Sequence, residues 1–200
     1  MTAIDIRGLN VAYGDKVIIE DFSLTVPVGA TVLVKGPSGC GKSTLLHAIC
    51  GLIDDNVTGT VDIFGNGKKE IGIVFQNPET QLFCGTVEDE IAFGLENICM
   101  SPDEMGMRIG EILALMNLEK YRHTSTAMLS GGEKQRVVLG AVLALEPRIL
   151  LLDEAWSMLD GASRHVLIQQ LLALKESGIT LVITSHDNDL DFMADSRVDM

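Results

Sequence analysis

The stretch that decides the fold is GPSGCGKST, residues 36–44, which fits the pattern Gly, four residues, Gly, Lys and then Ser or Thr. An apolar, β-branched run at 31–34 precedes it, and an apolar pattern with helical spacing follows at 45–49. A strand, a glycine-rich loop and a helix in this order are the context that a phosphate-binding loop requires. The sequence therefore predicts such a loop here.

The residue types of this loop explain how it would bind phosphate. Its glycines let the backbone turn tightly, and its N–H groups, together with the helix N-terminus behind them, form a nest for an anion. Lys42 would reach the β- and γ-phosphates of a nucleotide, ATP or GTP, and Ser43 would ligate Mg²⁺. Cys40 is either reactive or an inert small side chain. The predicted nucleotide-binding residues are Gly36, Pro37, Ser38, Gly39, Cys40, Gly41, Lys42, Ser43 and Thr44.

Size and charge limit the remaining possibilities. The chain has 200 residues, which suits one domain, and a net charge of −13, which argues against nucleic acid as an electrostatic partner. Its four cysteines lack metal-ligand spacing and are typical of reduced thiols in a cytosolic protein. No apolar stretch approaches the roughly 20 residues that cross a bilayer, and the N-terminus lacks a signal-peptide pattern.

The N-terminal part reads as strands. The run at 4–11 alternates in part and predicts a first strand, which resumes at 17–19 after a turn at 13–15, and the alternation at 22–26 indicates a half-buried antiparallel strand. Tyr13, in the turn at 13–15, would either stack on adenine or be an ordinary turn aromatic. A strand at 60–64, a hairpin turn at Gly65–Gly67 and a strand at 71–75 are expected next.

The rest of the chain alternates helices with buried strands. Apolar runs at 149–152 and 180–183 are typical of buried parallel strands, and helical patterns fill most of 77–145. This alternation predicts an α/β fold with a mainly parallel sheet and crossover helices. We expect a single domain, 1–200, in which 1–76 and 146–200 form the nucleotide-binding core with its antiparallel β part, and 77–145 forms a helical subdomain.

A second chemical element follows the first of these buried strands. Asp153 and Glu154 come directly after it, and ligands of open parallel sheets bind beyond the carboxyl ends of the strands. Asp153 would hold Mg²⁺, and Glu154 would polarise an attacking water. His186 follows the next buried strand and would either reach the γ-phosphate or be a structural histidine.

These parts, taken in order, resemble the ATPases of ABC transporters over nearly the whole chain. The resemblance rests on residues 36–44, Gln76, LSGGE at 129–133, residues 150–154, Asp160 and His186, and LSGGE followed by Gln135 is its most specific part. It implies a P-loop NTPase (RecA-like) fold with an N-terminal antiparallel β subdomain and an inserted helical signature subdomain. It also implies ATP and Mg²⁺ as the bound species.

The resemblance further implies a head-to-tail dimer with two ATP molecules between its subunits. The start of the LSGGE helix would form a second nest, for the γ-phosphate of the opposing subunit's ATP. Asp160 would act across that interface, Gln76 would contact Mg²⁺ and sense the γ-phosphate, and Tyr13 gains support as the adenine-stacking residue. The implied signature residues are Leu129, Ser130, Gly131, Gly132 and Glu133.

A narrower resemblance lies in residues 77–97, NPETQLFCGTVEDEIAFGLEN. This run looks like the ATPase subunits of energy-coupling-factor transporters, which import vitamins, cobalt and nickel. It implies a groove for a transmembrane scaffold subunit and a peripheral place on the cytoplasmic side of the membrane, reached only through partners. An ordinary amphipathic helix is the alternative. The implied groove residues are Leu82, Phe83, Glu88, Glu90, Ile91 and Phe93.

Two departures from the family pattern stand out. Ala155 and Trp156 occupy positions where the family usually has Pro and Thr, and the chain ends at Met200 where family members continue. The end indicates a truncated form, a short natural form or half of a fused tandem.

The rival functions are a soluble ABC ATPase of DNA repair or translation and a weakly hydrolytic partner subunit. The transported substrate, and whether the second ATPase is identical, stay open.

Overall fold

The computed structural model describes residues 1–53, 56–65, 67–157, 159–186 and 190–200. These residues form two compact units. The sheet unit consists of Met1–Ile73, Arg148–Glu154 and Leu174–Met200, and the helical unit consists of Val74–Pro147 and Ala155–Ala173. Among the described residues, no helix has both the length and the apolar character that a membrane span needs.

The sheet unit begins with a three-stranded antiparallel sheet. Strand β1 (Thr2–Tyr13) lies between β2 (Lys16–Pro27) and β4 (Val57–Ile63). One face of β1 is buried at alternating positions, as the apolar periodicity predicts, and Ile4 and Ile6 are almost fully buried. The remaining positions of β1 are partly buried or exposed.

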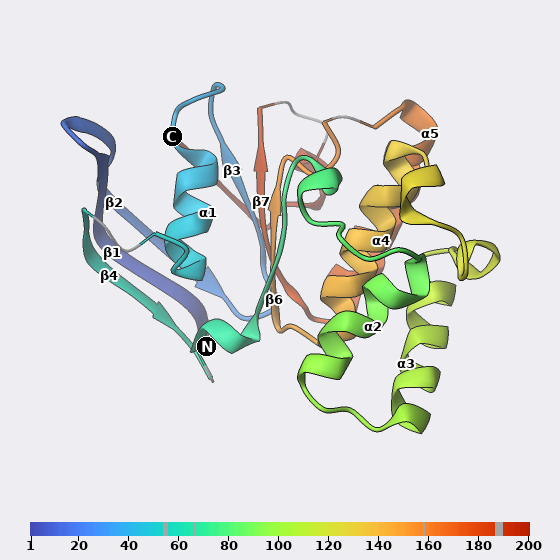
Figure 1. The fold of residues 1–200 in the computed structure, drawn as a ribbon. Helices are drawn as coiled ribbons and strands as arrows, with labels where there is room; N and C mark the ends of the chain where they lie inside the picture. Colours follow the sequence, from blue (N-terminus) through green and yellow to red (C-terminus); the bar gives the residue numbers. More distant parts are fainter. Residues whose placement is uncertain (54–55, 66, 158, 187–189) are drawn as a thin grey trace. The chain divides into compact units, whose positions relative to one another are not determined.

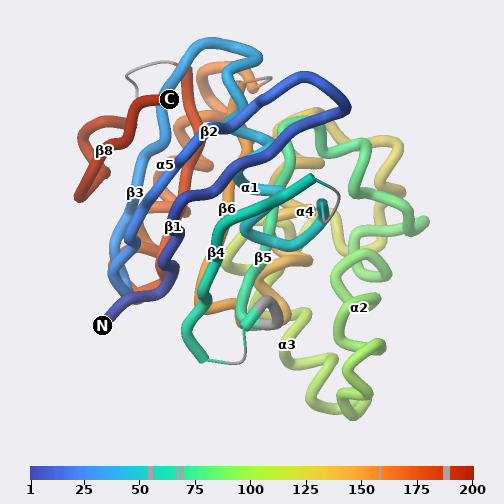
Figure 2. Tube along the Cα trace, turned by 90° about the vertical axis from the view of Figure 1, so that its left-hand side faces the viewer, coloured from blue at the N-terminus to red at the C-terminus, as the bar shows by residue number. Residues whose placement is uncertain are grey.

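A five-stranded sheet forms the second layer of this unit. Its strand order is β5 (Ile71–Val74), β6 (Ile149–Asp153), β7 (Thr180–Ser185), β3 (Thr31–Lys35) and β8 (Ser196–Asp199). The pairs β6–β7, β7–β3 and β3–β8 are parallel, and Figure 2 shows β8 at the sheet edge beside β3. Strands β3, β6 and β7 are buried at every position, which explains their unbroken apolar runs.

Helix α1 (Lys42–Cys50) lies between the two sheets, as Figure 1 shows. Its apolar side chains, among them Leu45, Leu46 and Ile49, join one hydrophobic core with the inner faces of both sheets. This packing fixes the start of α1, and therefore the loop in front of it, against the end of β3.

The helical unit packs α2 (Val87–Asn97), α3 (Pro102–Leu115) and α4 (Gly131–Ala144) against one another, and it contains most of α5 (Gly161–Glu176). Gly140 lets α3 and α4 approach closely, because a Cβ there would lie 2.9 Å from Ile112 Cγ2. Short 3-10 turns complete the chain at Gly67–Glu70, Pro78–Thr80, Glu119–Tyr121, Thr126–Met128 and Asp191–Met193.

The predicted fold class is confirmed, but two local predictions differ from the structure. The turn at Gly65–Gly67, whose middle residue Asn66 lies outside the described residues, does not close a hairpin, because β4 and β5 belong to different sheets. Residues 155–173 lie in the helical unit and not with the nucleotide-binding core. Gln170 explains part of this, since its Nε2 donates to the carbonyl oxygen of Leu115 at 3.3 Å.

Candidate active site

The phosphate-binding loop connects β3 to α1 and is tightly closed. Gly39 and Gly41 have φ of +82° and +109°, a region that side-chain-bearing residues rarely adopt. A Cβ on Gly36 would lie 2.5 Å from Cys40 Sγ, so this glycine has no room for a side chain. Gly41 precedes the first residue of α1, so the loop ends at a helix N-terminus, where free N–H groups favour an anion.

Lys42 is folded back over this loop. Its side chain is only 4 % exposed, and Nζ donates to the carbonyl oxygens of Gly36 at 2.7 Å and of Pro37 at 3.1 Å. Its third partner is Glu154 Oε1, at 3.1 Å. All three ammonium protons therefore have acceptors, and a phosphate oxygen would have to replace one of them.

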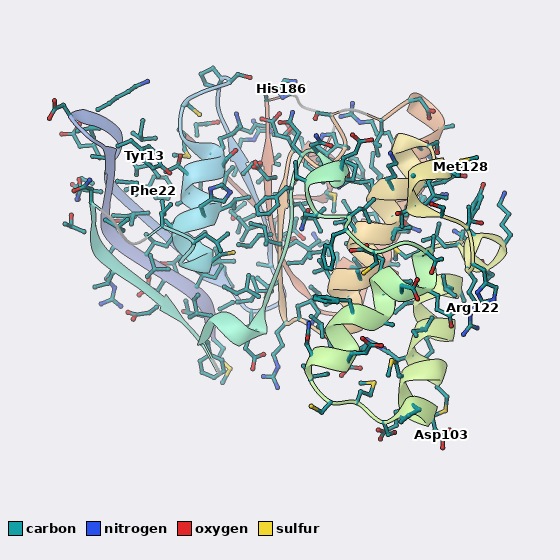
Figure 3. All side chains as sticks on the ribbon, viewed as in Figure 1. Tyr13, Phe22, Asp103, Arg122, Met128 and His186 are labelled. Atoms are coloured by element: carbon teal, nitrogen blue, oxygen red, sulfur yellow. The ribbon has the colours of Figure 1, made fainter. Side chains whose placement is uncertain are left out.

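Glu154 connects Lys42 to His186. Its carboxylate binds Lys42 through Oε1 and accepts from His186 Nδ1 through Oε2, at 3.0 Å. Glu154 follows β6 and His186 follows β7, and these strands are adjacent and parallel, so their ends lie at one edge of the sheet. Figure 3 labels His186 at the end of β7. The structure thus brings together three residues that lie far apart in the sequence.

Asp153 is buried beside this trio and is held by Thr184. The Thr184 hydroxyl donates to Asp153 Oδ1 at 2.9 Å and accepts from the backbone N–H of Glu154 at 3.1 Å. Sequence analysis did not single out Thr184. The only signal in the sequence was a hydroxyl residue directly after the apolar run 181–183, in a strand that is buried throughout.

The oxygen donors of the sheet unit fit Mg²⁺. The hydroxyl of Ser43, exposed in the first turn of α1, and the carboxylate of Asp153 are hard ligands of the kind that Mg²⁺ prefers. Mg²⁺ usually keeps several waters and phosphate oxygens, so one or two protein ligands suffice. The donor set is therefore compatible with a nucleotide-bound magnesium ion.

Tyr13 lies at the end of β1, with its ring 51 % exposed (Figure 3). It pairs in register with Lys16 at the β1–β2 turn. Its exposure, and its place in β1 next to the turn, are compatible both with stacking on adenine and with an ordinary aromatic residue beside a turn.

The signature residues lie in the helical unit, at the start of α4. Ser130 caps this helix: its N–H and hydroxyl both donate to Glu133 Oε2 at 2.8 Å, and the Glu133 N–H bonds back to the hydroxyl. The hydroxyl group of Ser130, one of the implied signature residues, is therefore hydrogen-bonded to Glu133 in this structure. Gly132 has no room for a side chain, because a Cβ there would lie 2.3 Å from Ser163 Oγ.

Asp160 and Gln76 have defined partners within the helical unit. Asp160 Oδ1 accepts from the N–H of Ser163 at 2.8 Å at the start of α5, and this hydrogen bond lowers the pKa of the carboxyl group. Gln76 Nε2 donates to Ser157 Oγ at 3.0 Å. Ala155 and Trp156, which stand where the family usually has Pro and Thr, are both buried.

A groove with a cavity of about 190 Å³ lies between α2 and α4, and we call it the α2–α4 groove. Phe83 and Phe93 stack edge to face across it, with ring centroids 4.6 Å apart, and both rings are substantially exposed. The groove is lined by Gln81, Phe83, Glu90, Phe93, Gly94, Val138, Ala141, Val142 and Leu145.

Half of the predicted groove residues lie elsewhere. Ile91 is fully buried, and Leu82 lines a neighbouring cavity with Lys134. Glu88 is not among the residues that line the groove, and its carboxylate is paired with Arg122 at 2.6 Å and with His123. Arg122 lowers the pKa of Glu88.

Glu90 lines the groove but is only 5 % exposed. Its Oε2 accepts from the backbone N–H groups of Phe83 and Cys84, at 3.1 and 2.7 Å. Because this buried acid fixes the backbone that carries Phe83, it shapes the groove and does not offer a solvent-exposed charge.

Known proteins match this chain over most of its length. The model of the family described as ABC transporter matches residues 19–157. The energy-coupling factor transporter ATP-binding protein EcfA1 of Leuconostoc mesenteroides is 38% identical over 98% of this chain and 76% of its own length. EcfA of Pediococcus pentosaceus is 37% identical over 92% of this chain and 70% of its own length.

A solved structure agrees with these matches. The structure of cbiO1 from Clostridium perfringens, described as part of the ABC transporter complex cbiONQ, superimposes with a TM-score of 0.90. It is 28% identical, and the match covers 100% of this chain and 84% of that one. Since the family match spans more than half of the chain and includes the phosphate loop, the LSGGE helix and the Asp153–Glu154 strand end, the chain belongs to the ABC transporter family, as one of its ATP-binding ATPases.

Proposed function

We propose that this chain is the ATP-binding subunit of an energy-coupling-factor importer, in which ATP hydrolysis drives the uptake of a micronutrient, a vitamin or a transition-metal ion. The observation that carries the importer assignment is the α2–α4 groove, with its exposed pair of phenylalanines in the helical unit. The similarity to two EcfA proteins and to cbiO1 supports the same assignment.

The sheet unit would supply the chemistry. An incoming γ-phosphate would take the place of Glu154 on Lys42, because the ammonium group then exchanges one anionic partner for another. The released Glu154 carboxylate would accept a proton from the attacking water, while His186 Nδ1 holds its second oxygen. Ser43, Asp153 and Gln76 are the residues that would contact Mg²⁺, and the ion would neutralise charge on the β- and γ-phosphates.

Two copies, or this chain and a paralogue, would form the working ATPase. The free N–H groups at the start of α4, around Gly131 and Gly132, would bind the γ-phosphate of ATP held by the opposing subunit. Leu129 and Glu133 would hold that helix start in place, and Asp160 would contact the opposing subunit. Tyr13 would stack on adenine.

The membrane partner would dock in the α2–α4 groove. An amphipathic helix fits an apolar groove with aromatic walls, and Phe83 and Phe93 are the kind of residues that dominate such interfaces. The chain would then lie at the cytoplasmic side of the membrane, held there by its scaffold subunit. A net charge of −13 gives it no general affinity for nucleic acid.

Removal of one groove aromatic tests this assignment. Phe93→Ala should weaken co-purification with the membrane scaffold about tenfold or more and reduce uptake in parallel, because buried aromatic anchors are typically worth about 2 kcal/mol or more. Binding of ATP by the phosphate loop should be retained. Uptake and ATPase activity would be measured with the complex reconstituted in vesicles.

Phe192→Ala is the matched control. Phe192 is 64 % exposed in the sheet unit, so its loss removes a comparable aromatic ring away from the groove. If Phe93→Ala assembles and transports as well as Phe192→Ala does, the groove does not bind the scaffold and the importer assignment loses its main support.

A further inference from the structure

The hydroxyl group of Thr184 lies where the two acids of the candidate active site meet. Thr184 is 0 % exposed, and in the β6–β7 register it stands directly opposite Asp153. Its Oγ1 lies 2.9 Å from Asp153 Oδ1, 3.3 Å from the carbonyl oxygen of Leu152 and 3.1 Å from the backbone nitrogen of Glu154. One side chain therefore contacts both acids.

The chemistry of a hydroxyl group determines the direction of these bonds. It has one proton to donate and two lone pairs to accept with. The nitrogen of Glu154 can only donate, so Oγ1 accepts from it. The single proton then goes to Asp153 Oδ1, which is closer than the Leu152 carbonyl and carries charge. The result is a chain from Glu154 N–H through Thr184 Oγ1 to the Asp153 carboxylate.

The backbone conformation of Glu154 indicates what this series of hydrogen bonds does. Glu154 has a φ of +45°, the left-handed region that a glutamate seldom adopts and that the surroundings must enforce. Its N–H is turned toward Thr184, and its carboxylate lies on Lys42 and His186, at 3.1 and 3.0 Å. In this unusual backbone conformation, the hydrogen-bond acceptor of the Glu154 N–H is the hydroxyl group of Thr184.

We propose that Thr184 is a positioning residue for ATP hydrolysis, which fixes the Asp153 carboxylate and the Glu154 backbone relative to each other. The proposal rests on the proposed roles of Asp153 and Glu154. In this role Thr184 would act through the two acids and not on the nucleotide or the cation directly. It acts by keeping one oxygen of Asp153 hydrogen-bonded and by holding Glu154 in the conformation from which its carboxylate serves as a base.

The test compares Thr184→Val, which keeps the shape and removes the hydroxyl group, with Thr184→Ser, which keeps the hydroxyl group. In the purified full chain, Thr184→Val should lower kcat for ATP by about 10- to 100-fold, the usual effect of losing such a supporting hydrogen bond. KM should change by no more than about twofold, because Lys42 and the loop backbone are intact. Thr184→Ser should restore kcat to within about threefold of the wild type.

A second readout does not depend on turnover. Mn²⁺ binding to the ADP complex, measured by electron paramagnetic resonance, should be about tenfold weaker in Thr184→Val and near normal in Thr184→Ser. ADP binding without metal should be equal in all variants. If Thr184→Val fails to fold, Thr184→Ala removes the same hydroxyl group without forcing a methyl group against Asp153, and the same predictions apply to it.

Thr180→Val is the matched control. Thr180 lies in the same strand, is 1 % exposed, and its hydroxyl oxygen accepts from the N–H of Gly29 at 2.9 Å, at the opposite end of β7. Its loss should lower the melting temperature while leaving kcat and Mn²⁺ binding unchanged. An equal fall in kcat for Thr180→Val and Thr184→Val would reduce the role of Thr184 to general stability and overturn the proposal.

Glu154→Gln, assayed in parallel, separates the two levels of inference. If Glu154→Gln hydrolyses ATP at the wild-type rate, the roles assigned to the acids fail, and the role of Thr184 fails with them. If Glu154→Gln is inactive and folded Thr184→Val matches the wild type in kcat and Mn²⁺ binding, only the positioning role of Thr184 is lost.

Discussion

The sheet unit and the helical unit carry their functional residues in opposite ways. In the sheet unit, Lys42, Asp153 and Glu154 are largely or wholly buried and are bonded to one another or to the loop backbone. In the helical unit, Phe83 and Phe93 are exposed, and Ser130 caps α4 through its reciprocal hydrogen bonds with Glu133. The sheet unit therefore presents buried, paired charges, whereas the helical unit presents exposed aromatic rings, and we propose a nucleotide for the first and partner chains for the second.

This difference has an energetic consequence. Burying charges is costly unless they are paired, so the buried Lys42 ammonium group and the Glu154 carboxylate stabilise each other. An exposed aromatic pair carries no such desolvation penalty, and it contributes binding free energy only when a partner covers it. Substitutions in the sheet unit should therefore change chemistry and nucleotide binding, whereas substitutions in the helical unit should change assembly.

The largest effect is expected for Glu154→Gln. Hydrolysis should fall by about 10² to 10⁴-fold, the usual contribution of a general base, because the amide accepts no proton from water at neutral pH. ATP binding should be retained or become tighter, since the variant no longer competes with phosphate for Lys42 as an anion. Single-turnover hydrolysis and ATP titration measure the two quantities, and Glu20→Gln, an exposed acid on β2, is the control. Wild-type hydrolysis in Glu154→Gln would remove this residue from the mechanism.

Lys42→Ala comes next, and its effect falls on binding. Each contact to a charged group is worth about 1.5–3 kcal/mol, so loss of the lysine should weaken ATP binding by about ten- to 100-fold or more. The uncompensated carboxylate of Glu154 should add repulsion toward the phosphates. Equilibrium titration with a fluorescent ATP analogue measures the affinity, and Lys120→Ala, in the helical unit, is the control. Unchanged affinity would contradict the phosphate-loop assignment.

For Ser130→Arg, we expect the effect on dimer assembly and not on nucleotide binding. The arginine would fill the space at the start of α4 that is proposed for the partner's γ-phosphate, so ATP-driven dimerisation should weaken about tenfold or more. Binding of ATP by the same subunit should persist. Light scattering with ATP and Mg²⁺ measures the dimer.

The structure provides a matched control for this substitution. Ser101 caps α3 through the same reciprocal pair of bonds that Ser130 makes at α4, with Glu104 in the place of Glu133. Ser101→Arg should therefore remove an equivalent helix cap and lower the free energy of unfolding by about 1 kcal/mol, without affecting dimerisation. If both variants dimerise equally well, the start of α4 does not face a second nucleotide.

The sheet unit was also the easier one to predict from the sequence. Unbroken apolar runs place buried parallel strands, and polar residues that follow such strands gather at one edge of the sheet, as Lys42, Glu154 and His186 do. Thr184 was missed because a single hydroxyl residue in an apolar strand has many structural explanations. Its task depends on the register of β6 against β7, which the composition of either strand leaves open.

The groove of the helical unit was predicted only in part, for a physical reason. Periodicity identifies which residues of α2 share a face, but it does not identify which face its neighbours leave uncovered. Ile91 therefore lies in the core while Phe93 reaches the groove. Glu90 was expected among the groove residues and does line the groove, but its carboxylate is buried, because it accepts from the backbone N–H groups of residues 83 and 84. Charge reversal at Glu90 would disrupt that loop and would not test docking cleanly.

The smallest expected effect concerns Asp195, which ties together two segments of the sheet unit. Its Oδ2 accepts from the backbone N–H of Thr31 and its Oδ1 from Lys175 Nζ, at 2.8 and 2.7 Å. Because the carboxyl group is 47 % exposed, solvent screens the ion pair, and Asp195→Asn should lower the free energy of unfolding by only about 1 kcal/mol at pH 7. Urea denaturation measures this loss, with Asp15→Asn, at an exposed turn, as the control.

The pH dependence of that loss separates charge from packing. The Lys175 side chain and then the Thr31 N–H lower the pKa of Asp195 below its ordinary value of 3.8. A lowered folded-state pKa means that the carboxylate contributes its stability above pH 3.8, and that this contribution disappears as the pH falls through the lower folded-state value. The difference in unfolding free energy between wild type and Asp195→Asn should therefore shrink between pH 7 and pH values of about 3 and below. A difference that stays constant over this range would mean that Asp195 contributes through packing and neutral hydrogen bonds, and that the sheet unit uses its charges for binding and chemistry alone.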